Sequence, residues 1–418
     1  MNHDKGAIMK KLQKTRSFYL ILLCWLVYTC SYIGKLSYNA NIIPIEEHFA
    51  VSHEVAGTVS TFFFFAYGIG QVVNGFLCKK YNAKYVIFAC LLISGGVNLV
   101  LPFITDFSLL KFIWLVNGAS MSFLWTLLIR LLSETLPDKD ISKAVFAMGT
   151  TVATGTFIVY GMSSLFVGIA SFKLTFYIAS GILISVSAVW LIFYNRLTDI
   201  SAEGATSEKL PLDIPEGGGI KVASLKIFIL AIAFFAVANN FIKDGLTAWT
   251  PSILEEKYST PGWLSILLTL LLPTLAIFGV AVAMRIQRVT GNFVGTCTLL
   301  FIGSSILIGG VILLINLPLL PVTVGCFALV CCLMSSVNNV ITSMVPLNMK
   351  RYMNSGKMAG ILNGFCYLGS TVSTYALGAV ADRYDWDGVF YLLLGVSVFV
   401  ILTGTAYLIY EKRKIRSI

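Results

Sequence analysis

Residues 84–105 read KYVIFACLLISGGVNLVLPFIT, a nearly unbroken apolar run that follows a single lysine. About 20 consecutive apolar residues in a helix are enough to cross the hydrocarbon core of a bilayer. The run therefore predicts a membrane-spanning helix. Similar runs recur along the chain, and together with this one they cover residues 17–43, 54–78, 84–105, 108–136, 143–171, 173–195, 224–254, 262–284, 293–316, 318–346, 357–380 and 388–410.

The composition agrees with a membrane protein. Of the 418 residues, 57% are hydrophobic and 12% are charged, whereas an ordinary soluble domain carries about 25% charged residues. The mean hydropathy is +0.84. So little charge excludes a water-soluble fold, and the 13% of aromatic residues excludes a disordered chain. We predict an all-α integral membrane protein with twelve transmembrane helices.

The positions of the basic residues predict the orientation, because cytoplasmic loops carry an excess of Lys and Arg. If the chain starts inside, the outward segments hold only Lys111, Lys173, Lys257 and Arg383, and nearly all other basic residues lie inside. We therefore expect a multi-pass protein of the cell (plasma or inner) membrane with both termini in the cytoplasm. The net charge of +10 is then a property of the inner membrane face, and no nucleic acid partner is expected.

The longest polar stretch divides the chain near its midpoint. It is rich in Pro and Gly, as flexible linkers are. We expect a basic cytoplasmic N-terminus (1–16), an N-terminal six-helix bundle (17–196), a cytoplasmic linker (197–223), a C-terminal six-helix bundle (224–410) and a cytoplasmic tail (411–418). The motif FKLTF at 172–176 recurs in outline as WDGVF at 386–390, in the equivalent outward turn. This echo supports two pseudo-symmetric halves.

Few charges lie inside the predicted spans, and such charges are functional hypotheses because burying them in a bilayer is costly. Lys35, Arg130 and Lys243 are the basic ones, and Asp244 is the acid well within a span. Lys35 and Lys243 occupy the first and seventh runs, which are equivalent in the two halves. Two such cations facing one central cavity favour a multiply charged anion, such as phosphate or a phosphoryl group. Alternatively, each lysine extends to the membrane interface or pairs with Asp244. For Arg130, the alternative is that it extends to the interface or pairs with Glu134.

The candidate substrate site combines these lysines with polar and aromatic residues at helical spacing. Tyr32, Tyr38 and Trp249 are suited to stack on an organic portion of the ligand. The predicted substrate-binding residues are Lys35, Lys243, Tyr32, Tyr38, Asn239, Trp249, Gln71, Asn339 and Tyr367, with Asp244 as a coupling residue or ion-pair partner.

We expect neither a catalytic site nor a metal site nor a cofactor. The histidines are His3, His48 and His53, and all lie outside the apolar spans. The cysteines lie in or at the ends of apolar runs, where they act as small packing residues. These positions assemble no nucleophile with a base and no metal-binding cluster within the membrane. The sequence therefore predicts that the protein is not an enzyme.

Three segments resemble the major facilitator superfamily, and within it the organophosphate:phosphate antiporters. They are residues 32–82, residues 240–255 (NFIKDGLTAWTPSILE) and residues 378–390 (GAVADRYDWDGVF). The resemblance implies a rocker-switch transporter whose phosphate-binding basic residues come from the first and seventh helices, at positions matched by Lys35 and Lys243.

The match is that of a divergent member. The family usually has Arg where this chain has the two lysines. It also usually has an Asp at the position where this chain has Lys79. Gln71 stands at the family's cavity lysine of the second helix, and a threonine, Thr151, at its helix-five histidine.

We therefore expect a secondary active transporter that moves an anionic, phosphorylated small metabolite by alternating access, in exchange for phosphate or another anion. The scarcity of acids within the spans favours exchange over ion coupling. The expected partners are the small-molecule anion and the lipid bilayer, with the protein as a monomer. Two alternatives stay open: a proton- or sodium-coupled symporter of an organic carboxylate, and a transporter-like substrate sensor.

Overall fold

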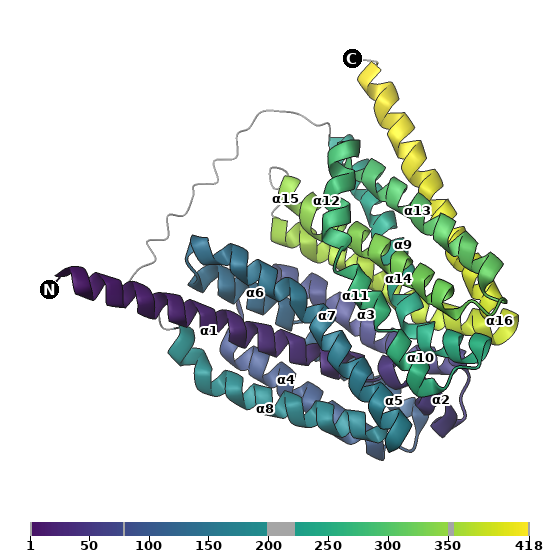
Figure 1. Ribbon diagram of the computed structural model, residues 1–418. Helices are drawn as coiled ribbons and strands as arrows, with labels where there is room; N and C mark the ends of the chain where they lie inside the picture. The colour runs from purple at the N-terminus through teal and green to yellow at the C-terminus, as the bar shows by residue number, and fades with distance from the viewer. Residues whose placement is uncertain (1, 78–79, 199–221, 350–354, 417–418) are drawn as a thin grey trace.

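The computed structural model describes residues 2–77, 80–198, 222–349 and 355–416, and the secondary structure of these residues is entirely helical (Figure 1). The N-terminal half consists of α1 (Asn2–Leu36), α2 (Ile42–Phe49), α3 (His53–Leu77), α4 (Ala83–Val100), α5 (Phe107–Met121), α6 (Leu124–Thr135), α7 (Asp138–Ile169) and α8 (Lys173–Thr198). Short 3₁₀ turns lie at Asn39–Asn41 and Leu101–Phe103. Helix α1 packs against α7 and α8, and α4 packs against α5 and α8. These contacts form one bundle.

The C-terminal half forms a second bundle. It consists of α9 (Val222–Tyr258), α10 (Gly262–Leu268), α11 (Leu271–Ala276), α12 (Gly279–Thr290), α13 (Phe293–Leu314), α14 (Leu320–Asn339), a π-helical turn (Val340–Met344), α15 (Val345–Asn348) and α16 (Ser355–Arg416). Helix α9 packs against α14 and α16, and α13 packs against the same two helices.

The predicted membrane fold is confirmed. Eleven described helical segments are long and apolar enough to cross a membrane, and the last of them runs from Met358 to Arg413. That segment reverses direction at Asp385, whose backbone has φ 57° and ψ 178° (Figure 1). A positive φ with an extended ψ is a conformation that residues other than glycine rarely adopt. The bend splits α16 into the eleventh and twelfth predicted spans.

Several predicted spans are broken helices. The fourth is divided into α5 and α6 near Ser122, and the eighth into α10, α11 and α12. The predicted linker falls almost wholly on residues 199–221, which lie outside the described residues.

The bundles meet where α3 packs on α16 and where α7 packs on α10. The first contact is very close: a Cβ built on Gly57 would lie 2.2 Å from the carbonyl oxygen of Thr374. Only glycine allows this approach between the backbones. Nearby, the carboxylate of Asp382 accepts from the backbone N–H groups of His53 and Glu54, at 3.1 and 2.8 Å.

We call this region, formed by α2, the first turn of α3 and the helix ends packed on them, the α2 end. It is the end that the sequence predicts to face outward. Among pairs of described residues, the hydrogen bonds and ion pairs between bundles extend from the α2 end as far as Lys35 and Tyr367.

Candidate functional site

A cavity of about 190 Å³ lies between the two bundles. Its walls come from α1, α3 and α7 of the first bundle and from α9, α11, α14 and α16 of the second. Three charged side chains line this central cavity: Lys35, Lys243 and Asp244. The structure therefore brings together the lysines of the first and seventh spans.

Aromatic rings surround the ammonium group of Lys35. Its Nζ lies 4.2 Å from the ring centre of Tyr67, 5.0 Å from that of Tyr32 and 5.2 Å from that of Tyr367. Two further rings, those of Phe63 and Phe64, lie at 5.9 and 6.0 Å. Each well-placed ring attracts a cation, by about 2 kcal/mol or more when the pair is desolvated.

The side chain of Lys35 is 8% exposed, and its Nζ lies 3.4 Å from the Tyr367 hydroxyl. None of the ion pairs between described residues includes it. Aromatic faces rather than a carboxylate thus compensate the charge of Lys35.

Lys243 is held differently. Its Nζ lies 3.3 Å from Oδ1 of Asp244, its neighbour on α9. The other oxygen, Oδ2, accepts hydrogen bonds from Asn240 and from Ser370 of α16. The ion pair considered as an alternative for Lys243 is therefore present. Together the three charged lining residues leave one net positive charge in the central cavity.

Helix α7 contributes lining residues that the sequence did not single out. Thr156 and Tyr160 face the central cavity one turn apart. Tyr160 is 1% exposed, and within the described part of the chain its hydroxyl has no hydrogen-bond partner. A buried hydroxyl without a partner is costly, and this one belongs to a residue that lines the central cavity. The i, i+4 spacing of the two polar residues within an apolar run was the only sequence signal for them.

Tyr32 and Tyr367 line the central cavity, but five other predicted site residues do not. Each of these five donates a hydrogen bond to the protein itself. Tyr38 donates to the carbonyl of Ala56, Trp249 to that of Thr374, Gln71 to that of Ser122, Asn339 to that of Ser335, and Asn239 to the side chain of Asn240. The structure gives them packing contacts around the site rather than positions on its wall.

Arg130 lies outside the central cavity as well. Its guanidinium donates to the carbonyl of Tyr81 at 3.0 Å and lies 3.6 Å from the carboxylate of Glu134.

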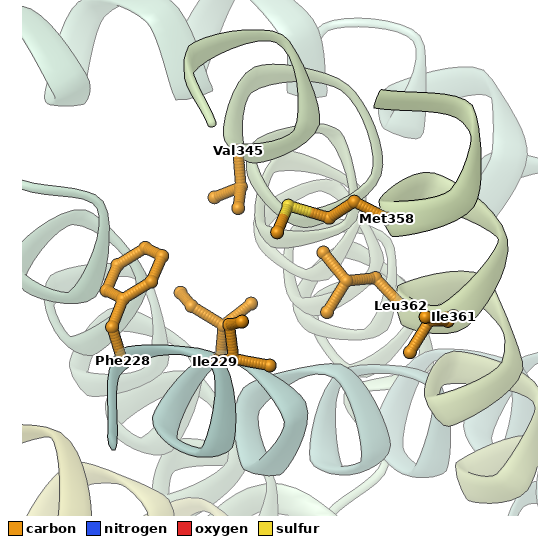
Figure 2. Close-up of a pocket in the computed structure, with 7 residues that line it drawn as sticks. Phe228, Ile229, Val345, Met358, Ile361 and Leu362 are labelled. Atoms are coloured by element: carbon orange, nitrogen blue, oxygen red, sulfur yellow. The ribbon is translucent and has the colours of Figure 1, made fainter. Parts of the chain in front are cut away.

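A second, smaller pocket lies in the C-terminal bundle, between the first turns of α9, α15 and the first turns of α16 (Figure 2). Its wall is apolar throughout and consists of Phe228, Ile229, Ile232, Val345, Met358, Ile361 and Leu362. With no polar side chain in this set, the pocket offers nothing to orient a charged ligand. The central cavity is therefore the better candidate for a substrate site.

Comparison with known proteins gives the family. The profile of the Major Facilitator Superfamily matches residues 24–355. The chain is 27% identical over 100 residues to the membrane sensor protein UhpC of Escherichia coli strain K12. This match covers 24% of this chain and 23% of that protein. It is 22% identical over 243 residues to the voltage-gated purine nucleotide uniporter SLC17A9 of Mus musculus, which covers 56% and 54%. The matches thus span about a quarter to a half of these relatives.

A solved structure shares the fold over nearly the whole chain. It is a bacterial homologue of the human lysosomal transporter Spinster, in an inward-facing and occupied conformation. The TM-score is 0.74 at 13% identity, over 94% of this chain and 96% of that one. The matched family and its structural neighbours are transporters, not enzymes.

Proposed function

The chain belongs to the Major Facilitator Superfamily, and from this premise we propose that it carries a small anionic, phosphorylated metabolite across the membrane in exchange for phosphate or another anion. The observation that carries the proposal is Lys35, a buried cation in the central cavity that is held by aromatic rings rather than by an acid.

This arrangement suits an anion for an electrostatic reason. A carboxylate partner would cancel the positive charge, whereas aromatic rings stabilise an ammonium group without neutralising it. In a buried site of low dielectric, the remaining field attracts an anion more strongly than it would in water. Lys35 is thus available to a phosphoryl group, and a bound anion would gain further hydrogen bonds from Lys243 and the free hydroxyl of Tyr160.

The position of the site suits alternating access. Lys35 belongs to the first bundle and Lys243 to the second, so an anion between them contacts both halves. Substrate sites at the interface of structural repeats are typical of transporters in which one repeat rocks against the other. A bound anion then shifts the balance between the two access states according to the difference in its affinity for them.

Counterflow tests the proposal. Proteoliposomes that contain the purified protein are loaded with phosphate, and uptake of labelled phosphate is measured with and without the internal load. A panel of sugar phosphates and other organophosphates is then offered as competitor. We expect uptake that requires internal anion and is inhibited by at least one organophosphate. Absence of counterflow for phosphate and for every member of the panel would reject the proposal.

A second candidate function is symport of an organic carboxylate coupled to protons or sodium. Asp244 favours it, because it is the only carboxylate among the described lining residues of the central cavity. Symport predicts accumulation driven by an imposed ion gradient in vesicles without internal anion. Replacing Asp244 with asparagine would then uncouple uptake from the gradient, whereas an exchanger would keep its counterflow.

A third candidate function is substrate sensing, which the match to a membrane sensor protein favours. A sensor would bind organophosphate with an affinity measurable by calorimetry and yet show no counterflow in the same preparation. Lys35→Met would abolish that binding as well, so binding and counterflow must be measured together.

A further inference from the structure

His53 lies at the α2 end between two carboxylates from different bundles. Its Nδ1 is 2.9 Å from Oε1 of Glu46 on α2, and its Nε2 is 2.9 Å from Oε1 of Glu256 on α9. Ionised carboxylates only accept hydrogen bonds, and a neutral imidazole donates from one nitrogen only. With both carboxylates ionised, a neutral imidazole can donate to only one of them. The two contacts together therefore require one additional proton.

The surroundings of His53 favour retention of that proton. Its ring packs against the indoles of Trp249 and Trp386, with centroids 5.4 and 5.1 Å away. The Trp386 Nε1–H also donates to the free oxygen of Glu256 at 2.8 Å, which fixes that carboxylate. Burial raises the pKa of the Glu46 carboxyl above its usual range.

Acids outnumber bases around this cluster. From every element packed on His53, the charged groups are Glu46 and Glu47 of α2, Glu54 of α3, Glu255, Glu256 and Lys257 of α9, and Asp382, Arg383, Asp385 and Asp387 of α16. Lys257 is engaged by Asp385 and Asp387, and Arg383 lies 3.7 Å from Glu54. A protonated His53 is thus the cation that faces Glu46 and Glu256.

We propose that His53, Glu46 and Glu256 form a proton-binding site that holds the α2 end closed, so that proton uptake favours the state in which the two bundles meet there. The inference rests on the proposed function, because alternating access requires the bundles to part at this end. Glu46 and His53 belong to one bundle and Glu256 to the other. Parting therefore removes one of the two carboxylates from the imidazolium.

Linkage fixes the sign of the effect. With both carboxylates in place, the closed state binds the proton more tightly than the open state does. A group whose affinity for the proton is higher in one state stabilises that state at low pH. The stabilisation is complete below the histidine pKa of the open state and is lost as the pH rises through that of the closed state. Between these two values the ratio of closed to open protein falls roughly tenfold per pH unit.

The chain contains a matched control. His48 belongs to the same end, and its ring lies between Phe49 and Phe172, at 5.0 and 5.5 Å, within the first bundle. No ion pair between described residues includes it. His48→Gln therefore removes a titratable imidazole from the α2 end without touching the contact between bundles.

Hydrogen–deuterium exchange tests the proposal on the full-length protein in lipid nanodiscs without substrate. Exchange of peptides that cover residues 42–60 and 375–390 is compared at about pH 6 and about pH 9, on either side of the ordinary histidine range, after correction for the intrinsic exchange rate. We expect corrected exchange to rise at least tenfold at the higher pH in the wild-type protein and in His48→Gln. We expect His53→Gln to exchange rapidly at both pH values.

Glu256→Gln keeps a hydrogen-bonding side chain but removes the charge from the second bundle. It should reduce the rise in exchange between the two pH values, because it lowers the histidine pKa of the closed state toward that of the open state. It remains informative if His53→Gln does not fold. A wild-type profile independent of pH, or an unchanged profile in His53→Gln or Glu256→Gln, would overturn the proposal. Because no substrate is present, this outcome is distinct from a failure of the counterflow experiment.

Discussion

Replacing Lys35 with methionine removes the positive charge from the aromatic cage and keeps a side chain of similar length. The aromatic cage consists of the five rings around Lys35, those of Tyr32, Phe63, Phe64, Tyr67 and Tyr367. A hydrogen bond to a charged group contributes roughly 1.5–3 kcal/mol, and each 1.4 kcal/mol is about tenfold in affinity. The side chain is only 8% exposed, so solvent screens the lost interaction little. We expect the affinity for phosphate or an organophosphate to fall by roughly ten- to more than a hundredfold.

The same substitution should leave stability unchanged or raise it. Lys35→Met loses the cation–π attraction, about 2 kcal/mol for a desolvated pair, but it also removes the cost of burying an ammonium group. Methionine sulfur packs well against aromatic rings, and five of them surround this position. A loss of binding would therefore not be a consequence of unfolding.

The assay is titration calorimetry with phosphate and with each active organophosphate, accompanied by a thermal unfolding curve. Lys111→Met is the matched control, because Lys111 lies on α5, is not among the residues that line the central cavity, and has its Nζ 6.0 Å from the ring centre of Phe107. Wild-type affinity within about twofold in Lys35→Met would refute the assignment of Lys35 to the anion site. Equal losses in Lys35→Met and Lys111→Met would refute it as well.

Three further substitutions test the geometry. Asp244→Asn raises the net charge of the central cavity by one, so phosphate should bind several-fold more tightly in calorimetry, by about 1 kcal/mol, with counterflow retained. Tyr160→Phe removes the unpartnered hydroxyl, so affinity should fall by about 1 kcal/mol while the melting temperature does not. Gly57→Ala places a methyl group against the carbonyl of Thr374 and should speed hydrogen exchange at the α2 end. Its control is Gly96→Ala, whose Cβ would have no neighbour within 4 Å.

The membrane fold could be predicted because the bilayer leaves few choices. A span needs about 20 apolar residues with every backbone group bonded internally, so run length and loop charge are sufficient. The breaks within spans could not be predicted in this way. The apolar run is nearly continuous from residue 108 to residue 136, yet the helix is interrupted near Ser122. There the hydroxyl and carbonyl of Ser122 interact with the side chains of Gln71 and Asn74 on α3, and such contacts are set by tertiary packing.

The lysine pair could be predicted because equivalent helices of two repeats face the same axis. Its surroundings could not, since the rings around Lys35 come from three helices, of which α16 is far away in sequence. Tyr38 and Tyr32 had similar sequence contexts, but the hydroxyl of Tyr38 is bonded to a backbone carbonyl. His53 lies outside the apolar runs, so the sequence pattern indicates no role for it. Its role depends on Glu256, a residue of the other bundle.

The aromatic cage and His53 of the proton site both lie along the contact between α3 and α16. His53 lies at one end of this contact, and at the other end a Cβ on Gly360 would lie 3.2 Å from the Cα of Gly75. Between them the rings of Tyr67 and Tyr367 meet with centroids 4.5 Å apart, beside the caged lysine. If one bundle rocks against the other, displacements are largest at the ends of the α3–α16 contact and smallest near its middle. The anion site is then preserved while the proton site is broken. A proton bound at the α2 end therefore changes access to the anion site without competing with the anion.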